Sequence, residues 1–325
     1  MRKLGMKVLV FGLIFFITLQ IGGKFDNIDQ QNTNNPNIIR MANASRFDSL
    51  DILFVGSSAC YSGINPLYFD SVGLRTYNLS VAAAGPYFYE LLINDYLRCV
   101  TKKPKSVFIQ VLPSTFMSDI DNFSNIGIHR YLQYPVSNEK IAMAYNEWVS
   151  YPSLLLKSFQ KGIRNLVYIE KASPVIVKQT LSDKGFYRSD EISSEAGEAV
   201  ESQSRSKWKQ QQFDTAKFNY LYRYIDSLKK HSVKVVLFSV SMNKLSDFFS
   251  RQYMSDYRNA VSKISSENFF LNTDQLLLDR SAYRDSDHLN THGAAIVTKT
   301  LIGEIFKNKE LRQLYNLPDS ISVTK

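Results

Sequence analysis

Five short apolar runs, separated by longer amphipathic segments, constrain the fold of this 325-residue chain more than any other feature. A short apolar run bounded by turn residues is typical of a buried strand, and the longer segments repeat their apolar residues with the period of a helix. Strands that alternate with helices form a parallel sheet with helices on both faces. The sequence therefore predicts an α/β fold, a three-layer αβα sandwich around a central, mostly parallel, five-stranded sheet. The expected strands are residues 51–55, 75–79, 106–111, 233–240 and 268–271, and the expected helices are residues 86–100, 218–230, 254–264 and 291–306.

Residues 116–212 interrupt this alternation. They contain two segments with helical character, residues 140–149 and 154–167, and a polar run over residues 189–206. Long excursions from a compact domain are often functional. We therefore expect a helical insertion that caps or flanks the site, with a surface excursion without a role as the alternative.

The first 25 residues have the pattern of an export signal. Arg2, Lys3 and Lys7 precede an apolar run over residues 8–21, and with its flanks this run approaches the roughly 20 residues that span a bilayer. The residues after it do not match the small-residue pattern of a cleavage site. This favours an uncleaved membrane anchor at residues 1–25, with the rest of the chain on the periplasmic or another extracytoplasmic face. Secretion after signal cleavage is the alternative.

A polar linker follows the expected anchor. Residues 26–49 are rich in Asn, Gln and Asp and have little apolar surface to bury. We expect them to tether a folded domain that comprises residues 50–325, with the insertion inside it.

Charge and cysteine content exclude several classes of function. The net charge is +9 and the isoelectric point is about 9.3, but the basic residues are scattered and form no tail of the kind that binds nucleic acid. The sequence has no phosphate-binding loop, no metalloprotease motif and no Cys/His cluster at metal-ligand spacing, so we expect neither a metal nor a cofactor. The two cysteines, Cys60 and Cys99, are either both free thiols or joined in one disulfide.

A serine follows the first expected strand, where such folds place their active sites. Gly56 and Ser57 precede Ser58, and a glycine here permits a tight turn that lets the serine project from the carboxyl end of the strand. Gly-Ser-Ser is also a common turn sequence. Ser58 is a candidate nucleophile only in combination with a base.

A histidine with a nearby carboxylate lies just before the closing helix. Asp285 precedes His288 by three residues, so its carboxylate can accept the Nδ1 proton and orient the imidazole as a base. Asp287 is the immediate neighbour of His288 and is less well placed to face it. The alternative is a polar group that caps the helix, which explains the aspartates but not the histidine.

A turn of small residues follows the second expected strand, within residues 77–86. Short side chains let backbone N–H groups approach a ligand, and such groups stabilise the oxyanion that forms in acyl transfer. A well-packed strand–helix turn is the alternative interpretation.

Together these pieces resemble the SGNH/GDSL hydrolase superfamily, and more closely its membrane-anchored branch near exopolysaccharide and teichoic-acid O-acyltransfer proteins. The resemblance spans residues 50–115 and 218–307, and the stretches that carry it are residues 54–58, 77–80, 104–109 and 285–290. It implies the flavodoxin-like fold of that superfamily, with Ser58 as nucleophile and Asp285 and His288 as its partners. It also implies an oxyanion hole built from the nucleophile's own N–H, a glycine after the second strand and an asparagine after the third.

The sequence departs from the family pattern at three positions. Ser57 stands where the family usually has aspartate, and the anchored branch also tends to have serine at this position. The glycine position falls near Ala82 and Ala83, where a backbone N–H can still serve, and Ser114 is the nearest substitute for the asparagine. We expect an oxyanion hole of Ser58, Ala83 and Ser114, weaker than usual because loss of one strong donor costs roughly 10²–10³ in turnover.

Two functions are consistent with these residues. The first is a serine-dependent esterase or O-acyltransferase that acts on acyl esters, such as acetyl esters, of a cell-envelope carbohydrate through an acyl-enzyme. The second is a catalytically degenerate module that binds a glycan or a membrane-bound acyl-transfer partner. In both, the partners are an ester or glycan and the membrane, and nucleic acid is not among them.

Overall fold

The computed structural model describes residues 40–41, 43–118, 181–192, 208–242, 248–274, 276–285 and 287–318. All of these except residues 40 and 41 belong to one unit, formed by Asn43–Asp121 and Gln179–Lys325. The expected anchor at residues 1–25 and the expected insertion helices lie outside the described residues. In the part of the chain that is described, no helix has the length and apolar character needed to cross a membrane.

Five parallel strands form one sheet in the order β2-β1-β3-β4-β5. The strands are β1 (Ile52–Val55), β2 (Thr76–Asn78), β3 (Ser106–Gln110), β4 (Lys234–Phe238) and β5 (Phe269–Leu271). Each strand lies within a run that the sequence predicted, and all four neighbouring pairs are parallel. β1, β2 and β3 are buried over their full length, as expected for strands covered on both faces. The predicted α/β class is confirmed.

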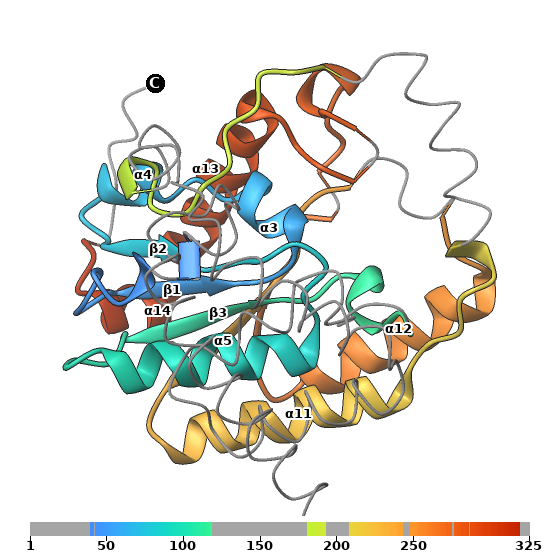
Figure 1. Cartoon of the computed structure of the whole chain (residues 1–325), viewed down its shortest axis with the longest axis horizontal. Coiled ribbons are helices and arrows are strands. Elements are labelled where there is room, and N and C mark those ends of the chain that lie inside the picture. Colours follow the sequence, from blue (N-terminus) through green and yellow to red (C-terminus); the bar gives the residue numbers. More distant parts are fainter. Residues whose placement is uncertain are drawn as a thin grey trace, which may run out of the picture. The chain divides into compact units, whose positions relative to one another are not determined.

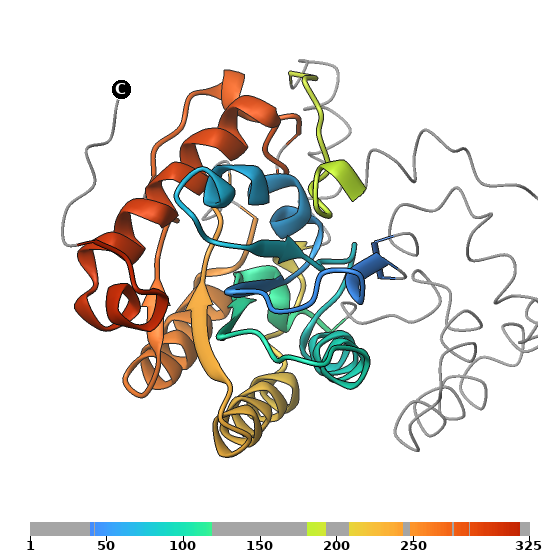
Figure 2. The ribbon, with the colours of Figure 1, turned by 90° about the vertical axis from the view of Figure 1, so that its left-hand side faces the viewer.

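Helices cover the two faces of the sheet in separate groups (Figures 1 and 2). One face carries α3 (Ser58–Gly63), α4 (Pro66–Asp70), α13 (Thr291–Lys307) and α14 (Lys309–Tyr315), and the other carries α5 (Pro86–Cys99), α11 (Thr215–Lys230) and α12 (Arg251–Ser265). Two 3-10 helices, η1 (Pro113–Phe116) and η4 (Arg280–Ala282), lie after β3 and before α13. This is the predicted three-layer sandwich. The sequence did not predict α3, α4 and α14.

The short helices α3 and α4 have different causes. Asn65 caps α4 by accepting a hydrogen bond from the Leu67 N–H at 3.0 Å, and Pro66 has the backbone angle that a first helical residue needs. α3 has no side-chain cap and is too short to be stable alone. Asn78, at the end of β2, fixes its far end by donating to the carbonyl oxygens of Cys60 and Ile64 at 3.0 and 2.9 Å.

The larger part of the core lies between the sheet and α13. Phe54, Phe108 and Phe238 come from three neighbouring strands, and their ring centroids are 5.1 to 6.2 Å apart. Val297 and Leu301 of α13 belong to the same cluster. Each ring buried in this way contributes roughly 1.5–3 kcal/mol to folding relative to an exposed ring. This burial fixes α13 against the sheet.

The same core also joins α3 to the segment that precedes α13. Cys60 and Ile64 from the α3 region and Leu289 from that segment are fully buried members of one cluster. A Cβ atom added to Gly63 would lie only 3.4 Å from Leu289 Cδ1, which shows how closely the two segments approach. Residues more than 200 positions apart in the chain therefore meet at one end of the sheet.

Candidate active site

The carboxyl ends of β1 and β3 form the point where the connections of the sheet diverge. The chain leaves β1 toward β2 on one side and leaves β3 toward β4 on the other. In open α/β sheets, ligands bind at such a point, just outside the carboxyl ends of the strands. Ser58 follows β1 and Ser114 follows β3, so both predicted residues lie at this edge.

Ser58 is the half-buried first residue of α3. Its carbonyl oxygen accepts a hydrogen bond from Ser62 Oγ at 2.9 Å. Within the described residues, neither its hydroxyl nor its N–H forms a hydrogen bond. The first N–H groups of a helix lack an acceptor inside the helix, so this N–H is available to an oxyanion.

Gln110, the last residue of β3, holds the turn that precedes Ser58. Its Oε1 accepts hydrogen bonds from the N–H and the hydroxyl of Ser57, each at 2.8 Å, and its side chain is fully buried. A Cβ atom on Gly56 would lie 2.7 Å from Gln110 Cβ and 2.6 Å from Cys60 Cβ. Gly56 does not have a positive φ. The glycine is therefore required by close approach of its neighbours and not, as the sequence suggested, by a special turn conformation.

Asp285 and His288 form the hydrogen-bonded pair that their spacing predicted. Asp285 Oδ1 lies 2.7 Å from His288 Nδ1 and also accepts from the His288 N–H at 2.9 Å. Asp287 Oδ1 is farther from Nδ1, at 3.4 Å, so Asp285 is the closer partner. His288 Nε2 is buried and has no hydrogen-bond partner in the described part of the chain. With the proton on Nδ1, the ring presents Nε2 as a proton acceptor.

Asn290, and not either aspartate, caps the closing helix. Its Oδ1 accepts from the Gly293 N–H at 3.0 Å, and its Nδ2 donates to the Ser281 carbonyl oxygen at 2.7 Å. The capping role that was an alternative explanation for this polar stretch therefore belongs to Asn290. Asp285 is left to hold His288.

The charges around His288 determine its protonation. Burial by itself lowers the pKa of the ring, but the hydrogen bond with Asp285 and the charges of Asp287 and Asp285 outweigh it, so the pKa of His288 lies above its ordinary value of 6.5. Burial raises the pKa of Asp285, whereas the hydrogen bond and charge of His288, with smaller contributions from Asp287 and Arg284, lower it below its ordinary value of 3.8. Asp285 therefore stays ionised and can stabilise an imidazolium.

No hydrogen bond joins Ser58 to His288 Nε2 in this structure, since Nε2 has no partner among the described residues. Catalytic hydrogen bonds are often long before substrate binds. The packing of Leu289 against α3 brings the two residues to the same end of the sheet. Their cooperation in one catalytic triad stays a prediction.

The predicted oxyanion donors lie on segments that flank the start of α3. The Val81 N–H donates to the Gly56 carbonyl oxygen at 3.0 Å, which brings the turn containing Ala83 beside the end of β1. Ala83 has a left-handed φ of 57°, and its N–H has no acceptor among the described residues. On the other side, Leu112 packs in one cluster with Ala59, which follows Ser58.

Ser114, two residues after Leu112, is half-buried, and the described residues provide no hydrogen-bond partner for its hydroxyl. An oxyanion hole of Ser58, Ala83 and Ser114 is therefore consistent with the arrangement of the three segments. It stays a prediction.

One group of side chains could hold a metal ion. Asp285, Asp287 and His288 each offer a ligand atom, and these atoms lie within 4.8 Å of one another. His288 Nδ1 cannot donate a proton to Asp285 and bind a cation at the same time. Metal binding and the predicted triad are therefore mutually exclusive uses of these residues, which a chelator can tell apart.

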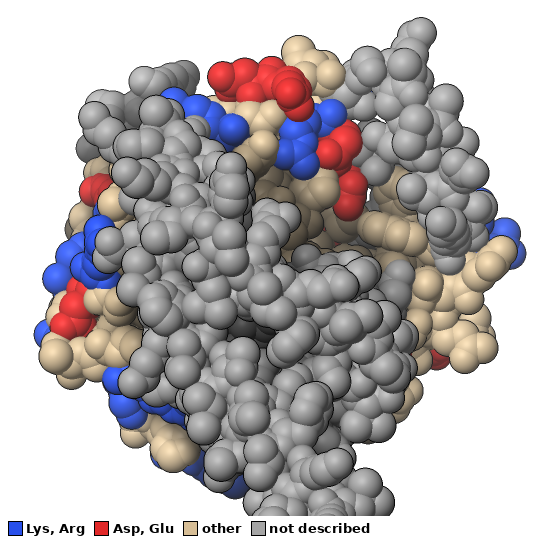
Figure 3. All heavy atoms as spheres, viewed as in Figure 1, with Lys and Arg blue, Asp and Glu red and all other residues tan. Residues whose placement is uncertain are grey.

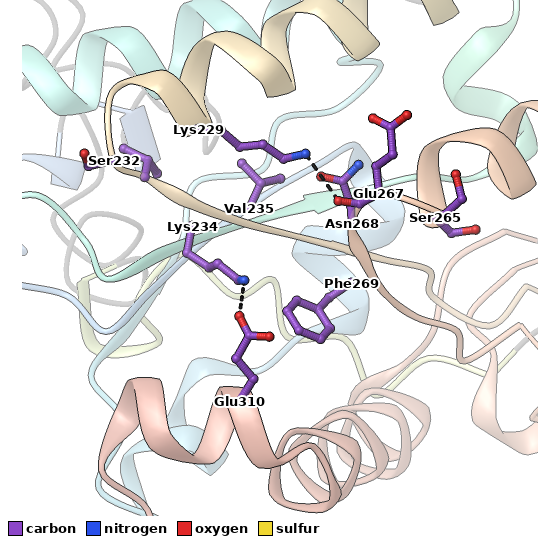
Figure 4. A pocket seen from close by; sticks show the side chains of 11 residues that line it. Lys229, Ser232, Lys234, Val235, Ser265, Glu267, Asn268, Phe269 and Glu310 are labelled. Carbon is purple, nitrogen blue, oxygen red and sulfur yellow. Dashed lines mark hydrogen bonds and ion pairs between the residues drawn. The ribbon is translucent and has the colours of Figure 1, made fainter.

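A cavity of about 740 Å³ lies at the opposite edge of the sheet, around the amino ends of β4 and β5 (Figure 4). Its charged side chains are engaged with neighbours: Lys234 pairs with Glu310, and Lys229 Nζ donates to the Glu267 carbonyl oxygen at 3.3 Å. None of the predicted site residues lines it. We therefore place the candidate site at the carboxyl edge.

Sequence reasoning missed three residues of this region: Gln110, Arg284 and Tyr187. Gln110 had one available signal, since it is a polar residue at the end of an otherwise apolar strand. Arg284 contacts Asp285 Oδ2 through Nε and Nη2, both at 3.1 Å, and its guanidinium lies 5.4 Å from the ring centroid of Tyr187. No local pattern marks a contact between residues about 100 positions apart.

No family model and no curated protein matches the chain. Among solved structures, the chain is similar to a proposed platelet activating factor from Streptococcus pneumonia, with 11% identity over 92% of this chain and 98% of that one and a TM-score of 0.41. It is also similar to a proposed acylhydrolase from Bacteroides fragilis, with 9% identity, 84% and 94% coverage and a TM-score of 0.42. A GDSL-like lipase from Bacteroides thetaiotaomicron gives 11% identity, 78% and 85% coverage and a TM-score of 0.34. At these scores the likeness is weak, and the function proposed below rests on the geometry of the site.

Proposed function

We propose that this chain is a serine-dependent esterase or O-acyltransferase that acts on acyl esters of a cell-envelope carbohydrate. The observation that carries the proposal is the pair of Asp285 and His288, joined at 2.7 Å, with the other ring nitrogen buried and without a partner among the described residues. The loop that bears this pair packs against α3, whose first residue is Ser58. A serine, an oriented imidazole and a carboxylate are the parts of an acyl-transfer triad.

In the proposed reaction, His288 Nε2 takes the proton of the Ser58 hydroxyl while Oγ bonds to the carbonyl carbon of the ester. The tetrahedral intermediate then collapses, and the imidazolium returns the proton to the departing sugar oxygen. The Ser58 acyl ester passes its acyl group to water, or to another sugar hydroxyl, by the same steps in reverse order. Asp285 remains ionised throughout and stabilises the imidazolium.

The oxyanion of the intermediate needs donors beside Ser58. The Ser58 and Ala83 N–H groups and the Ser114 hydroxyl are proposed for this role, because each lacks a partner within the described residues. The Ser114 hydroxyl stands where the family that the chain resembles uses an asparagine side-chain amide. We expect correspondingly modest turnover.

The carbohydrate substrate and the location are the finer parts of the proposal. Their support is the apolar run at residues 8–21, the polar linker and the resemblance of residues 54–58 and 285–290 to the anchored acyl-transfer branch. An anchor at residues 1–25 would hold the domain at the extracytoplasmic face, next to envelope glycans and a membrane-bound acyl donor.

Active-site labelling tests the catalytic part directly. Purified protein is treated with a fluorescent fluorophosphonate and assayed with p-nitrophenyl acetate, alongside Ser58→Ala and the control Ser71→Ala, which removes an exposed hydroxyl at the end of α4. We expect wild type and the control to be labelled and active, and Ser58→Ala to be neither. Turnover that persists in Ser58→Ala, or that is abolished by a chelator, would reject the triad.

The second function, a degenerate binding module, is motivated by the hydroxyl at Ser114 in place of an amide. A folded wild-type protein that is not labelled but retains an acetylated glycan in a binding assay would favour it. Labelled wild-type protein would exclude it.

A further inference from the structure

Residues 181–192, here called the bridging segment, run from the end of β2 past α3 to the start of α13 (Figures 1 and 2, yellow-green). The Asn78 N–H donates to the Lys184 carbonyl oxygen at 2.9 Å, and the Tyr187 N–H donates to the Tyr61 carbonyl oxygen at 2.8 Å. Farther along, the Thr291 N–H donates to the Ser189 carbonyl oxygen at 2.7 Å. The segment is thus hydrogen-bonded in turn to β2, to the serine-bearing helix and to the helix that follows His288.

Tyr187 occupies the middle of this bridge. Its ring meets that of Tyr61, three residues after Ser58, edge to face at 5.6 Å. On its other side, the Arg284 guanidinium lies 5.4 Å from the ring centroid, within the range of a cation–π contact. One aromatic ring therefore contacts both the serine-bearing helix and the loop that carries Asp285.

Arg284 and His288 bind different oxygens of the Asp285 carboxylate. Nε and Nη2 of Arg284 both lie 3.1 Å from Oδ2, whereas His288 Nδ1 lies 2.7 Å from Oδ1. The backbone closes the same loop, because the Arg284 N–H donates to the His288 carbonyl oxygen at 2.9 Å. A planar guanidinium that holds one carboxylate oxygen sets the direction of the other.

From these contacts we propose that Tyr187 and Arg284 act as positioning residues, which align Asp285 and His288 with the serine-bearing helix. This proposal rests on the proposed function, since it concerns the geometry of that triad. The bridging segment belongs to the stretch that the sequence predicted to cap or flank the site. Acidic and basic side chains lie next to one another on this face of the molecule (Figure 3), and Arg188 pairs with Asp183 within the segment as Arg284 pairs with Asp285 in the loop. The insertion would thus hold part of the catalytic geometry in place.

The contacts specify which atoms matter. Tyr187 acts through its ring, because the described residues give its hydroxyl no hydrogen-bond partner. Arg284 acts through the planar geometry of its guanidinium, which places two nitrogens on Asp285, and through its positive charge. The charged groups that face His288 in the described part of the chain are Asp285, Asp287 and Arg284, and Arg284 is the one that opposes protonation of the imidazole. The two contributions can be tested separately, because lysine keeps the positive charge but lacks the planar guanidinium.

Five variants test the proposal: Tyr187→Phe, Tyr187→Ala, Arg284→Gln, Arg284→Lys and the control Arg258→Gln, which changes an exposed arginine on α12. The readouts are kcat and KM for p-nitrophenyl acetate from pH 5 to 9, thermal stability, and NMR titration of the His288 ring, assigned by its absence in His288→Gln. We expect Tyr187→Phe and the control to match wild type. We expect Tyr187→Ala and both Arg284 variants to lower kcat by roughly 10-fold to 100-fold, as small displacements of catalytic groups do, with KM within about twofold.

The pH dependence separates positioning from a merely structural role. Arg284→Gln should move the acid limb of kcat/KM and the His288 titration to higher pH, and Arg284→Lys should leave both near the wild-type positions while kcat is still reduced. Unchanged kcat in Tyr187→Ala, or equal loss in Tyr187→Phe and Tyr187→Ala, would overturn the proposal. So would a loss of activity that only follows the unfolded fraction, with the pH profile unaltered.

The two proposals fail in distinguishable ways. A wild-type protein that fluorophosphonate does not label rejects the proposed function. Because the positioning residues serve that triad, the present proposal then falls with it, whereas a labelled wild-type protein with unchanged kcat in Tyr187→Ala rejects the present proposal alone.

Discussion

His288 has one nitrogen committed to Asp285 and one that is buried without a partner in the described structure. Because the Asp285 hydrogen bond and the charge of Asp287 raise the pKa of His288 above 6.5, the imidazole is protonated, and inactive as a base, over a wider acid range than a free histidine. kcat/KM for p-nitrophenyl acetate should therefore rise with pH through a midpoint above 6.5. A midpoint below this value in wild type would contradict the assignment of His288 as base.

The Asp285→Asn variant tests the contribution of the carboxylate to the pKa of His288 and to turnover. Loss of the carboxylate should lower turnover by roughly 10⁴-fold, as for a triad aspartate replaced by asparagine, and should move the acid limb to lower pH. Both quantities come from one series of pH–rate profiles. A variant with full turnover would show that the pair is structural.

Ala83, in the turn beside the end of β1, has a left-handed backbone conformation with a φ of 57°. A left-handed conformation costs a non-glycine residue roughly 1–2 kcal/mol, part of which glycine recovers. Ala83→Gly should therefore stabilise the protein by about 0.5–1 kcal/mol in urea denaturation, while turnover stays near wild type because the N–H proposed for the oxyanion is retained. A loss of stability would mean that the alanine methyl group packs against a neighbour.

At the scale of elements, two glycines of α13 differ in their surroundings, and only Gly293 determines how closely the helix approaches the loop that bears Asp285 and His288. A Cβ on Gly293 would lie 2.1 Å from the Ala282 carbonyl oxygen, whereas a Cβ on Gly303 would meet nothing within 4 Å. The Ala282 carbonyl oxygen also accepts from the Asn290 N–H at 3.0 Å, so this contact closes the loop from both sides.

The two alanine substitutions should consequently have opposite effects. Gly293→Ala should destabilise the protein by roughly 1–3 kcal/mol or more and lower turnover, since η4 and the catalytic loop must shift. Gly303→Ala should stabilise it by up to about 1 kcal/mol through helix propensity alone. Thermal unfolding and esterase assays on the pair measure both effects, and similar behaviour of the two variants would show that the close contact is unimportant.

Which elements the sequence could predict follows from how each is stabilised. The strands and the long helices were predictable because burial imposes a pattern on their own residues, as in the fully buried β1 and β3. α3 was not, because its six residues are too few to show a repeated helical pattern and because its support comes from Asn78 across the core. α4 carried a signal that was overlooked, namely Asn65 followed by Pro66.

The same distinction applies to the site as a whole. Asp285 and His288 are three residues apart, and their contact was predictable from spacing. Gln110 and Tyr187 reach the site only because the sheet and the bridging segment bring separate parts of the chain together. Contacts of this kind leave no periodic trace in the sequence, so tertiary structure is needed to find them.

At the scale of the whole molecule, the Asp285–His288 pair links catalytic geometry to global stability. The pKa of His288 is raised on folding, so the native state binds a proton that the unfolded state releases as the pH rises above 6.5. The stability that this pair adds is therefore fully present below pH 6.5 while Asp285 is ionised, and is lost as the pH rises through the raised value. Asp285 has the opposite sign, since its lowered pKa adds stability above 3.8 that is lost as the pH falls through the lowered value.

Urea denaturation of wild type and His288→Gln from pH 4 to 9 measures this linkage. The wild-type advantage in free energy of unfolding should be largest between the two ordinary values, near pH 4 to 6.5, and should decline toward pH 9. In Asp285→Asn the decline on the alkaline side should be weaker, because the hydrogen bond and charge that raise the pKa of His288 are gone. An advantage of wild type that increases with pH would mean that the imidazole is held neutral in the folded protein, and that the electrostatic description of the site is wrong.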